Sequence, residues 1–313
     1  MSRYSISDAV FFATSHDKKS KHFKRLAIAY ILAKIIFFAV TAAIAFPFMG
    51  ALMELLSDDL TSEAVQLELG AQISVFSNIQ SLFGLLFLPF FLAVMSSFYR
   101  WTVNDDWSSK RFGLRFGATE LHLFLVYLVV YGLVFLAALL LIIPFSIVIS
   151  IQFAASDELN SGLILIAFFG SFAIFCFLIW LSVKLSLASA LTVRHGDIKI
   201  FESFSASKGH FWKLFGSYLF LILIYMVAVL ALLIVMAIIV LPFFGIGVAM
   251  FGMSPGEADY LMIAALAVIP VVIITIIALL MEFWAYVASA GIGAYFVRWK
   301  DGDPVERVAK EFE

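Results

Sequence analysis

The stretch KLFGSYLFLILIYMVAVLALLIVMAIIVLPFFGIGVAM, residues 213–250, decides the fold. No charged residue follows Lys213 before Glu257. Since a helix needs only about 20 apolar residues to cross the hydrocarbon core of a bilayer, this run predicts a transmembrane helix. Five further apolar runs predict the other spans, at about 26–53, 78–99, 121–151, 161–193 and 259–297.

Composition supports the same class of protein. Of the 313 residues, 64% are hydrophobic and only 13% are charged, which excludes a water-soluble fold. The apolar runs do not alternate with a period of two residues, so they do not favour a transmembrane barrel. The sequence therefore predicts an all-α, polytopic membrane protein with six transmembrane helices. Several runs exceed the minimum length, which predicts tilted helices, kinked helices, or helix ends that extend out of the hydrocarbon as amphipathic helix.

The positive charges fall on one side of the predicted spans. All 20 lysines and arginines except Lys34 and Lys184 lie in residues 1–25, 100–122, 194–213 and 298–313. Basic residues that flank spans stay in the cytoplasm, so both termini are expected to be cytoplasmic. The expected location is the bacterial cytoplasmic (inner) membrane.

The opposite loops carry acidic residues and no basic ones. They are residues 54–77, 152–161 and 250–260, with Glu54, Asp58, Asp59, Glu63, Glu68, Asp157, Glu158, Glu257 and Asp259. This asymmetry predicts that the three loops are external.

An internal repeat is indicated within a single transmembrane domain, residues 1–313. A shift of 98 residues aligns Tyr127 with Tyr225 and Pro144 with Pro242, and a shift of 97 brings Pro47 onto Pro144. The repeat units would be residues 1–100, 101–196 and 197–300, each a helical hairpin, followed by a charged cytoplasmic tail, 301–313. Apolar helices also resemble one another by composition alone, so common ancestry is one of two explanations.

Residues 197–215 are expected to form an amphipathic helix at the cytoplasmic membrane surface. Asp197 could cap its start and Gly209 could end it. Residues 6–14 and 101–116 suggest looser versions. Such helices either anchor the protein at the boundary or recognise anionic lipid or a cytosolic partner. The candidate interfacial face consists of Ile198, Phe201, Phe204, Lys208, Phe211 and Trp212.

Three ionisable residues lie inside the predicted spans: Lys34, Lys184 and Glu282. Lys34 is near enough to the cytoplasmic interface for its ammonium to reach the headgroups. Lys184 and Glu282 differ by the repeat shift and have opposite charges, so we expect an intramembrane polar pair between them. That pair would be a structural salt bridge or a site for a proton, an ion or a headgroup, and absence of contact is the third alternative.

Signatures of enzymes are missing from the sequence. The five histidines form no metal-spaced pair on a helix, and there is neither a GxSxG motif nor a Walker loop. The single cysteine, Cys176, cannot form an intramolecular disulfide and is expected to pack as a small apolar residue. We therefore expect no catalytic residues, no metal site and no cofactor. The expected partners are membrane lipids and a membrane-protein partner, and no nucleic acid.

The stretch ASALTVRHGDIKIFESFSASKGHFWK, residues 188–213, carries a family resemblance. It resembles polytopic bacterial proteins related to the membrane domain of glycerophosphoryl diester phosphodiesterases, including the YciC-type inner-membrane proteins. In those families a helix of small residues ends in a short turn, and an amphipathic helix precedes a Lys- or Gly-containing break. Here Ser203, Ser205 and Ser207 precede Lys208 and Gly209. The resemblance implies a membrane module, since the catalytic residues of the phosphodiesterase domain have no counterpart.

These features predict a non-enzymatic membrane module that assists or scaffolds lipid or envelope processes or a membrane-protein partner. Two alternatives remain open: a small transporter or lipid-translocating protein that uses the region of Lys184 and Glu282, and an accessory subunit of a larger membrane complex.

Overall fold

The computed structural model describes residues 4–15, 21–57, 63–107, 113–155, 161–251 and 257–301. These residues form α-helices and contain no strand. The helices are α1 (Ile6–Ser15), α2 (Lys21–Ser57), α3 (Glu63–Asn104), α4 (Ala118–Ala155), α5 (Ser161–Leu185), α6 (Ala188–His195), α7 (Glu202–Ala206), α8 (Phe211–Phe251) and α9 (Glu257–Asp301).

Among the described residues, six segments are long and apolar enough to cross a membrane, which confirms the predicted fold class. They are Lys21–Ile44, Gly70–Asn104, Ala118–Ile147, Phe168–His195, Phe211–Ile239 and Val272–Asp301. The chain is thus an all-α, multi-pass integral membrane protein. Its helices are longer than a single crossing requires, since the 45 residues of α9 measure about 68 Å against a hydrocarbon core of about 30 Å.

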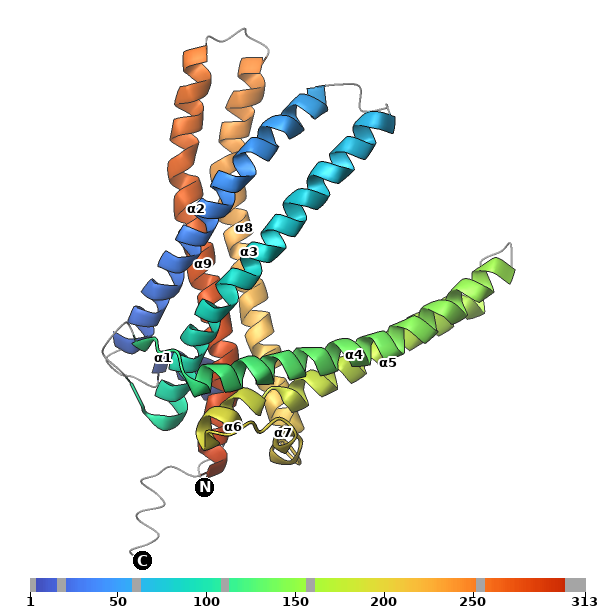
Figure 1. The fold of residues 1–313 in the computed structure, drawn as a ribbon, viewed down its shortest axis with the longest axis vertical. Helices are drawn as coiled ribbons and strands as arrows, with labels where there is room; N and C mark the ends of the chain where they lie inside the picture. Colours follow the sequence, from blue (N-terminus) through green and yellow to red (C-terminus); the bar gives the residue numbers. More distant parts are fainter. Residues whose placement is uncertain are drawn as a thin grey trace, which may run out of the picture.

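Consecutive long helices pack against each other: α2 on α3, α4 on α5, and α8 on α9. Figure 1 shows that α4 and α5 run side by side away from the other two pairs. The fourth predicted span is divided, because α5 ends at Leu185 and α6 begins at Ala188. Of the repeated prolines, Pro144 lies inside α4, whereas the side chains of Pro47 and Pro242 lie outside the described residues.

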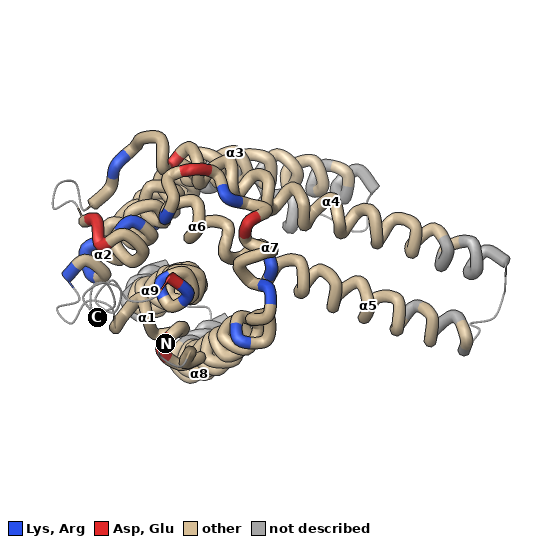
Figure 2. Tube along the Cα trace, turned by 90° about the horizontal axis from the view of Figure 1, so that it is seen from below, with Lys and Arg blue, Asp and Glu red and all other residues tan. Residues whose placement is uncertain are grey.

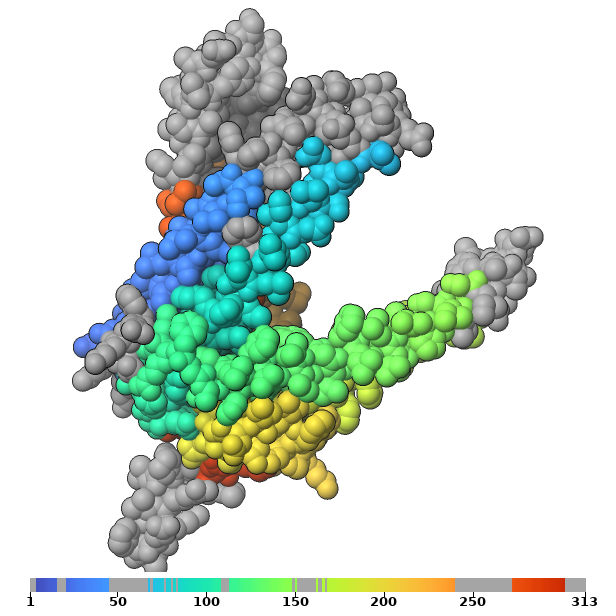
Figure 3. All heavy atoms as spheres, viewed as in Figure 1, coloured from blue at the N-terminus to red at the C-terminus, as the bar shows by residue number. Residues whose placement is uncertain are grey.

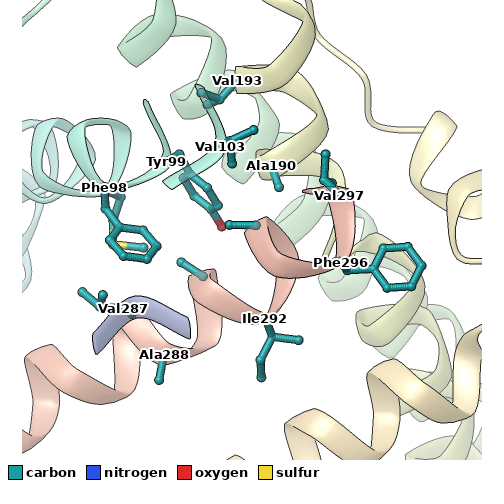
Figure 4. Packing of buried hydrophobic residues seen from close by; sticks show 14 of the residues in the cluster. Phe98, Tyr99, Val103, Ala190, Val193, Val287, Ala288, Ile292, Phe296 and Val297 are labelled. Atoms are coloured by element: carbon teal, nitrogen blue, oxygen red, sulfur yellow. The ribbon is translucent and has the colours of Figure 1, made fainter. Parts of the chain in front are cut away.

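The packed core lies where α3, α6 and α9 meet, near the arginine-bearing ends of these helices. Figure 4 shows Phe98 and Tyr99 of α3 beside Ala190 of α6 and Val287 of α9. Small residues on α6 and α9 let the backbones approach closely: a Cβ at Gly293 would lie 3.7 Å from the Ala190 Cβ. Farther along the helices the apolar side chains are exposed to the surroundings, as expected for lipid-facing surfaces.

The expected helix over residues 197–215 is corrected by the structure. Gly209 adopts a left-handed conformation with φ of 77°, which breaks the helical path between α7 and α8. Asp197 does not cap α7, because its N-cap is Phe201 and makes no side-chain cap bond. Gly209 does interrupt the helix, although it lies beyond the C-cap of α7, Ser207.

The two looser amphipathic segments are also integrated into the helical packing. Residues 6–14 lie in α1, which packs on α8 and α9 and buries Ala9, Val10 and Ala13. Residues 101–116 do not form one helix, since Trp101 is buried in the last turns of α3 and Gly113 lies in the following connection. There Gly113 has φ of 84°, and its backbone packs against the Trp107 ring.

Candidate intramembrane site

An ion pair joins α2 to α9 within the candidate spans. The Lys34 Nζ donates to the Glu282 Oε1 at 3.0 Å, and the two side chains are 17% and 29% exposed. A single charge inside a bilayer costs about 2.5 to 3.5 kcal/mol even on insertion scales. The pair reduces that cost for both residues, so Lys34 is held by Glu282 within the packed helices.

Aromatic rings surround the ammonium of Lys34. Its Nζ lies 5.0 Å from the centroid of Phe87, 5.7 Å from that of Tyr30 and 5.9 Å from that of Phe38. A cation near an aromatic face is attracted by the ring quadrupole, and the attraction is stronger in a desolvated setting. The site therefore stabilises the positive charge through one carboxylate and three rings from α2 and α3.

The predicted pair between Lys184 and Glu282 is wrong. Glu282 has Lys34 as its ion-pair partner, and the Lys184 Nζ instead donates to the Ser207 carbonyl at 3.5 Å. The physical reason is the break after α5, because Lys184 in the last turn of α5 lies beside the end of α7. Equivalent positions in successive repeat units do not have to meet in space.

A second polar network ties the ends of α3 and α4 together. Arg100 forms a salt bridge with Glu120, and both side chains are about 90% buried, at 10% and 8% exposure. Ser96 donates its Oγ proton to the same Glu120 oxygen at 2.7 Å, and Ser97 donates to the Gly113 carbonyl. The sequence reasoning missed Glu120; its place in the first turn of an apolar helix, twenty residues after an arginine, was the available signal.

Two arginines join the end of α3 to α6 and α9. Arg194 bonds Asp301 at 3.2 Å and the Val103 carbonyl at 3.1 Å. Arg298 bonds Asp105 and the Thr102 carbonyl, each at 3.0 Å. From the sequence these arginines were identified only as topology signals. In the structure they also donate hydrogen bonds to backbone carbonyls in the last turn of α3.

An open apolar cleft with a volume of about 730 Å³ lies between α3 and α4. Figure 3 shows the wedge between these helices, where α4 departs from the rest of the molecule. Tyr127 and Tyr131 stack on its α4 side with ring centroids 6.1 Å apart. Its lining residues are Leu88, Phe91, Phe124, Tyr127, Leu128, Tyr131, Gly132, Val134, Phe135 and Ala138.

The predicted interfacial face is divided by the structure. Ile198, Phe201 and Trp212 are exposed, at 43%, 70% and 77%, and Lys208 is exposed as well. Phe204 and Phe211 instead pack against buried clusters. Half of the predicted aromatic face is therefore available to the surroundings, and the other half holds α7 and α8 in place.

Comparisons with known proteins give no relative: no family model, no curated protein and no solved structure matches this chain. Among the described residues, no group of three or more histidines, cysteines and carboxylates could hold a metal ion.

Proposed function

We propose that this chain is a non-enzymatic lipid-handling module of the bacterial cytoplasmic membrane, with both termini in the cytoplasm. In this proposal the cleft between α3 and α4 receives the acyl chain of a membrane lipid. The observation that carries it is the 730 Å³ apolar cavity. A relationship to the phosphodiesterase membrane-domain proteins is part of the same proposal, through the resemblance of residues 188–213.

The chemistry of the cleft favours an acyl chain. Its lining residues on α3 and α4 belong to candidate transmembrane spans, so hydrocarbon is the medium that surrounds the cavity. The volume falls in the range of about 300 to 1,000 Å³ that is usual for small-molecule sites. A polar solute would find no charged partner among the lining residues.

The polar network at the start of α4 favours a persistent cleft between α3 and α4. Arg100 and Glu120 join α3 to α4 at the start of α4, while the cavity extends from Phe124 to Ala138 farther along that helix. A fixed contact at one end and apolar contacts beyond it allow the two helices to diverge without losing their connection.

The test fills the cavity with a side chain. Gly132 lines the cleft, and a Cβ placed there would meet nothing within 4 Å, so Gly132→Phe can occupy the space. Gly84 on α3 is equally open but does not line the cavity, which makes Gly84→Phe a matched control. Native mass spectrometry of protein released from nanodiscs should show that Gly132→Phe retains fewer lipids than the parent protein and Gly84→Phe. Equal lipid retention by all three proteins would contradict binding of an acyl chain in the cleft.

A small transporter is the second candidate function, and the Lys34–Glu282 pair favours it. Ionisable groups within spans commonly mark ion or proton pathways. In proteoliposomes with an imposed membrane potential, such a transporter would give a proton or cation flux that Glu282→Gln abolishes. A lipid-handling module gives no flux with either protein.

A further inference from the structure

Four lysines gather around the connection from α7 to α8: Lys184, Lys208, Lys213 and Lys300. The Lys300 Nζ donates to the Ala206 carbonyl at 3.0 Å, and the Lys184 Nζ donates to the neighbouring Ser207 carbonyl at 3.5 Å. Since these carbonyls are consecutive, two ammonium groups from α9 and α5 converge on the end of α7. Figure 2 shows basic residues along this connection and at the end of α9.

No carboxylate forms an ion pair with these lysines in the part of the chain that the structure describes. The nearby acids have other partners: Glu202 pairs with Lys199 at 2.6 Å, and Asp301 pairs with Arg194 at 3.2 Å. Lys213 lies over the ring of Trp299, 4.5 Å from its centroid.

The environment of His210 reflects this excess of positive charge. Burial lowers the pKa of His210, and the charges of Lys213 and Lys300 lower that pKa further. The position of the cluster also matters, because it lies at the end of α5, the start of α8 and the end of α9. Exposed Phe201 and Trp212 flank it, and tryptophan is enriched at the membrane–water interface.

We propose that Lys184, Lys208, Lys213 and Lys300 form a binding site for the phosphate of an anionic glycerophospholipid. Lys208 and Lys300 are exposed and supply donors to the phosphate, and α8 begins at Phe211, so the positive end of its helix dipole adds to the attraction. A lipid rather than a soluble phosphate is indicated by the exposed aromatic residues beside the lysines. The site does not depend on the α3–α4 cleft, since other elements build it.

The test measures binding of short-chain phosphatidylglycerol to the full chain in a zwitterionic detergent. Lys208→Gln and Lys300→Gln should each weaken binding about fivefold, because a basic residue near a membrane surface contributes about 1 kcal/mol. Lys199→Gln is the matched control: it removes a lysine close in sequence that already has Glu202 as its partner. Circular dichroism and thermal unfolding check that each variant is folded, and Lys208→Gln is the safer variant because its side chain is exposed.

Two results would overturn this site. Binding that falls equally in Lys199→Gln and Lys208→Gln would show general charge attraction instead of a built site. Glycerol 3-phosphate that binds as tightly as phosphatidylglycerol would show that the ligand is a soluble phosphate. None of the four lysines lines the α3–α4 cleft, so Lys208→Gln tests this site and Gly132→Phe tests the cleft, and failure of either proposal leaves the other standing.

Discussion

Lys34 and Glu282 depend on each other because each charge alone would be costly inside the bilayer. Removing one partner of a buried ion pair typically costs about 3 to 5 kcal/mol, since the survivor must change protonation or become hydrated. Both side chains keep some exposure, so we expect losses near the lower end of that range. The three rings around Lys34 would remain but cannot neutralise it.

The first prediction is a coupled double-mutant cycle. Lys34→Met and Glu282→Gln should each lower thermal stability in detergent, and the double variant should recover much of the loss. The control cycle pairs Lys184→Met with Glu282→Gln and should be additive. Additivity in the Lys34 cycle, or coupling in the Lys184 cycle, would contradict the pairing.

The second prediction concerns pH and His210. Its pKa in the folded protein lies below the ordinary value of 6.5, so below pH 6.5 the unfolded chain binds a proton that the folded chain binds less well. The contribution of neutral His210 to the free energy of unfolding should be fully present above pH 6.5. It should be lost as the pH decreases towards the lowered pKa of His210 in the folded protein. His210→Gln should reduce this slope in thermal unfolding measured from about pH 5 to pH 8. An unchanged slope in His210→Gln would refute the assignment.

The charges within spans could be found from sequence, but their partners could not. Lys34, Lys184 and Glu282 stand out because the residues around them are apolar. Choosing between two lysines for one carboxylate requires the packing of α2 against α9, and the break after Leu185 that turns Lys184 towards α7. No local pattern encodes either feature.

At the scale of elements, the junction of α3 and α4 depends on Arg100 and Glu120. We predict that Arg100→Met lowers the free energy of unfolding by about 3 to 5 kcal/mol, because it leaves the buried carboxylate of Glu120 without its counter-ion. Arg115→Met is the matched control. Its partner is Asp106 and both side chains are about half exposed, so it should cost at most about 1 kcal/mol. Thermal unfolding in detergent measures both, and equal effects would contradict the structural role of Arg100.

Element boundaries were predictable where the apolar runs are long and less so between them. Six spans follow from the runs, because their length and hydropathy exceed what a crossing needs. The short α7 does not follow, since Ile198, Phe201 and Phe204 have helical spacing but Gly209 breaks the path. Phe204 and Phe211 could be assigned to lipid or to core only once their packing against the buried clusters was known.

At the scale of the whole molecule, the charge asymmetry predicts orientation. In a Cys176→Ala background, cysteines at Leu60 and Asp157 should react with an impermeant maleimide in intact cells. Cysteines at His195 and Ser205 should react only after the membrane is opened. The reverse pattern would contradict the cytoplasmic placement of the basic ends.

The departure of the α4–α5 pair from the other long helices could not be predicted from sequence, because every span is apolar on most of its surface. Tyr127 and Tyr131 resemble ordinary span residues until the structure places them on the wall of a cavity. With the cleft and the basic cluster, we propose that one molecule contacts both the acyl chains and the headgroups of lipids.

Electron cryomicroscopy of the protein in lipid nanodiscs shows directly whether an acyl chain occupies the cleft between α3 and α4. A cleft that binds an acyl chain should contain elongated density between α3 and α4, along Leu88, Tyr131 and Phe135, and this density should disappear in Gly132→Phe. An α4 that packs closely on α3, with side chains filling the space and no lipid density, would contradict binding of an acyl chain there.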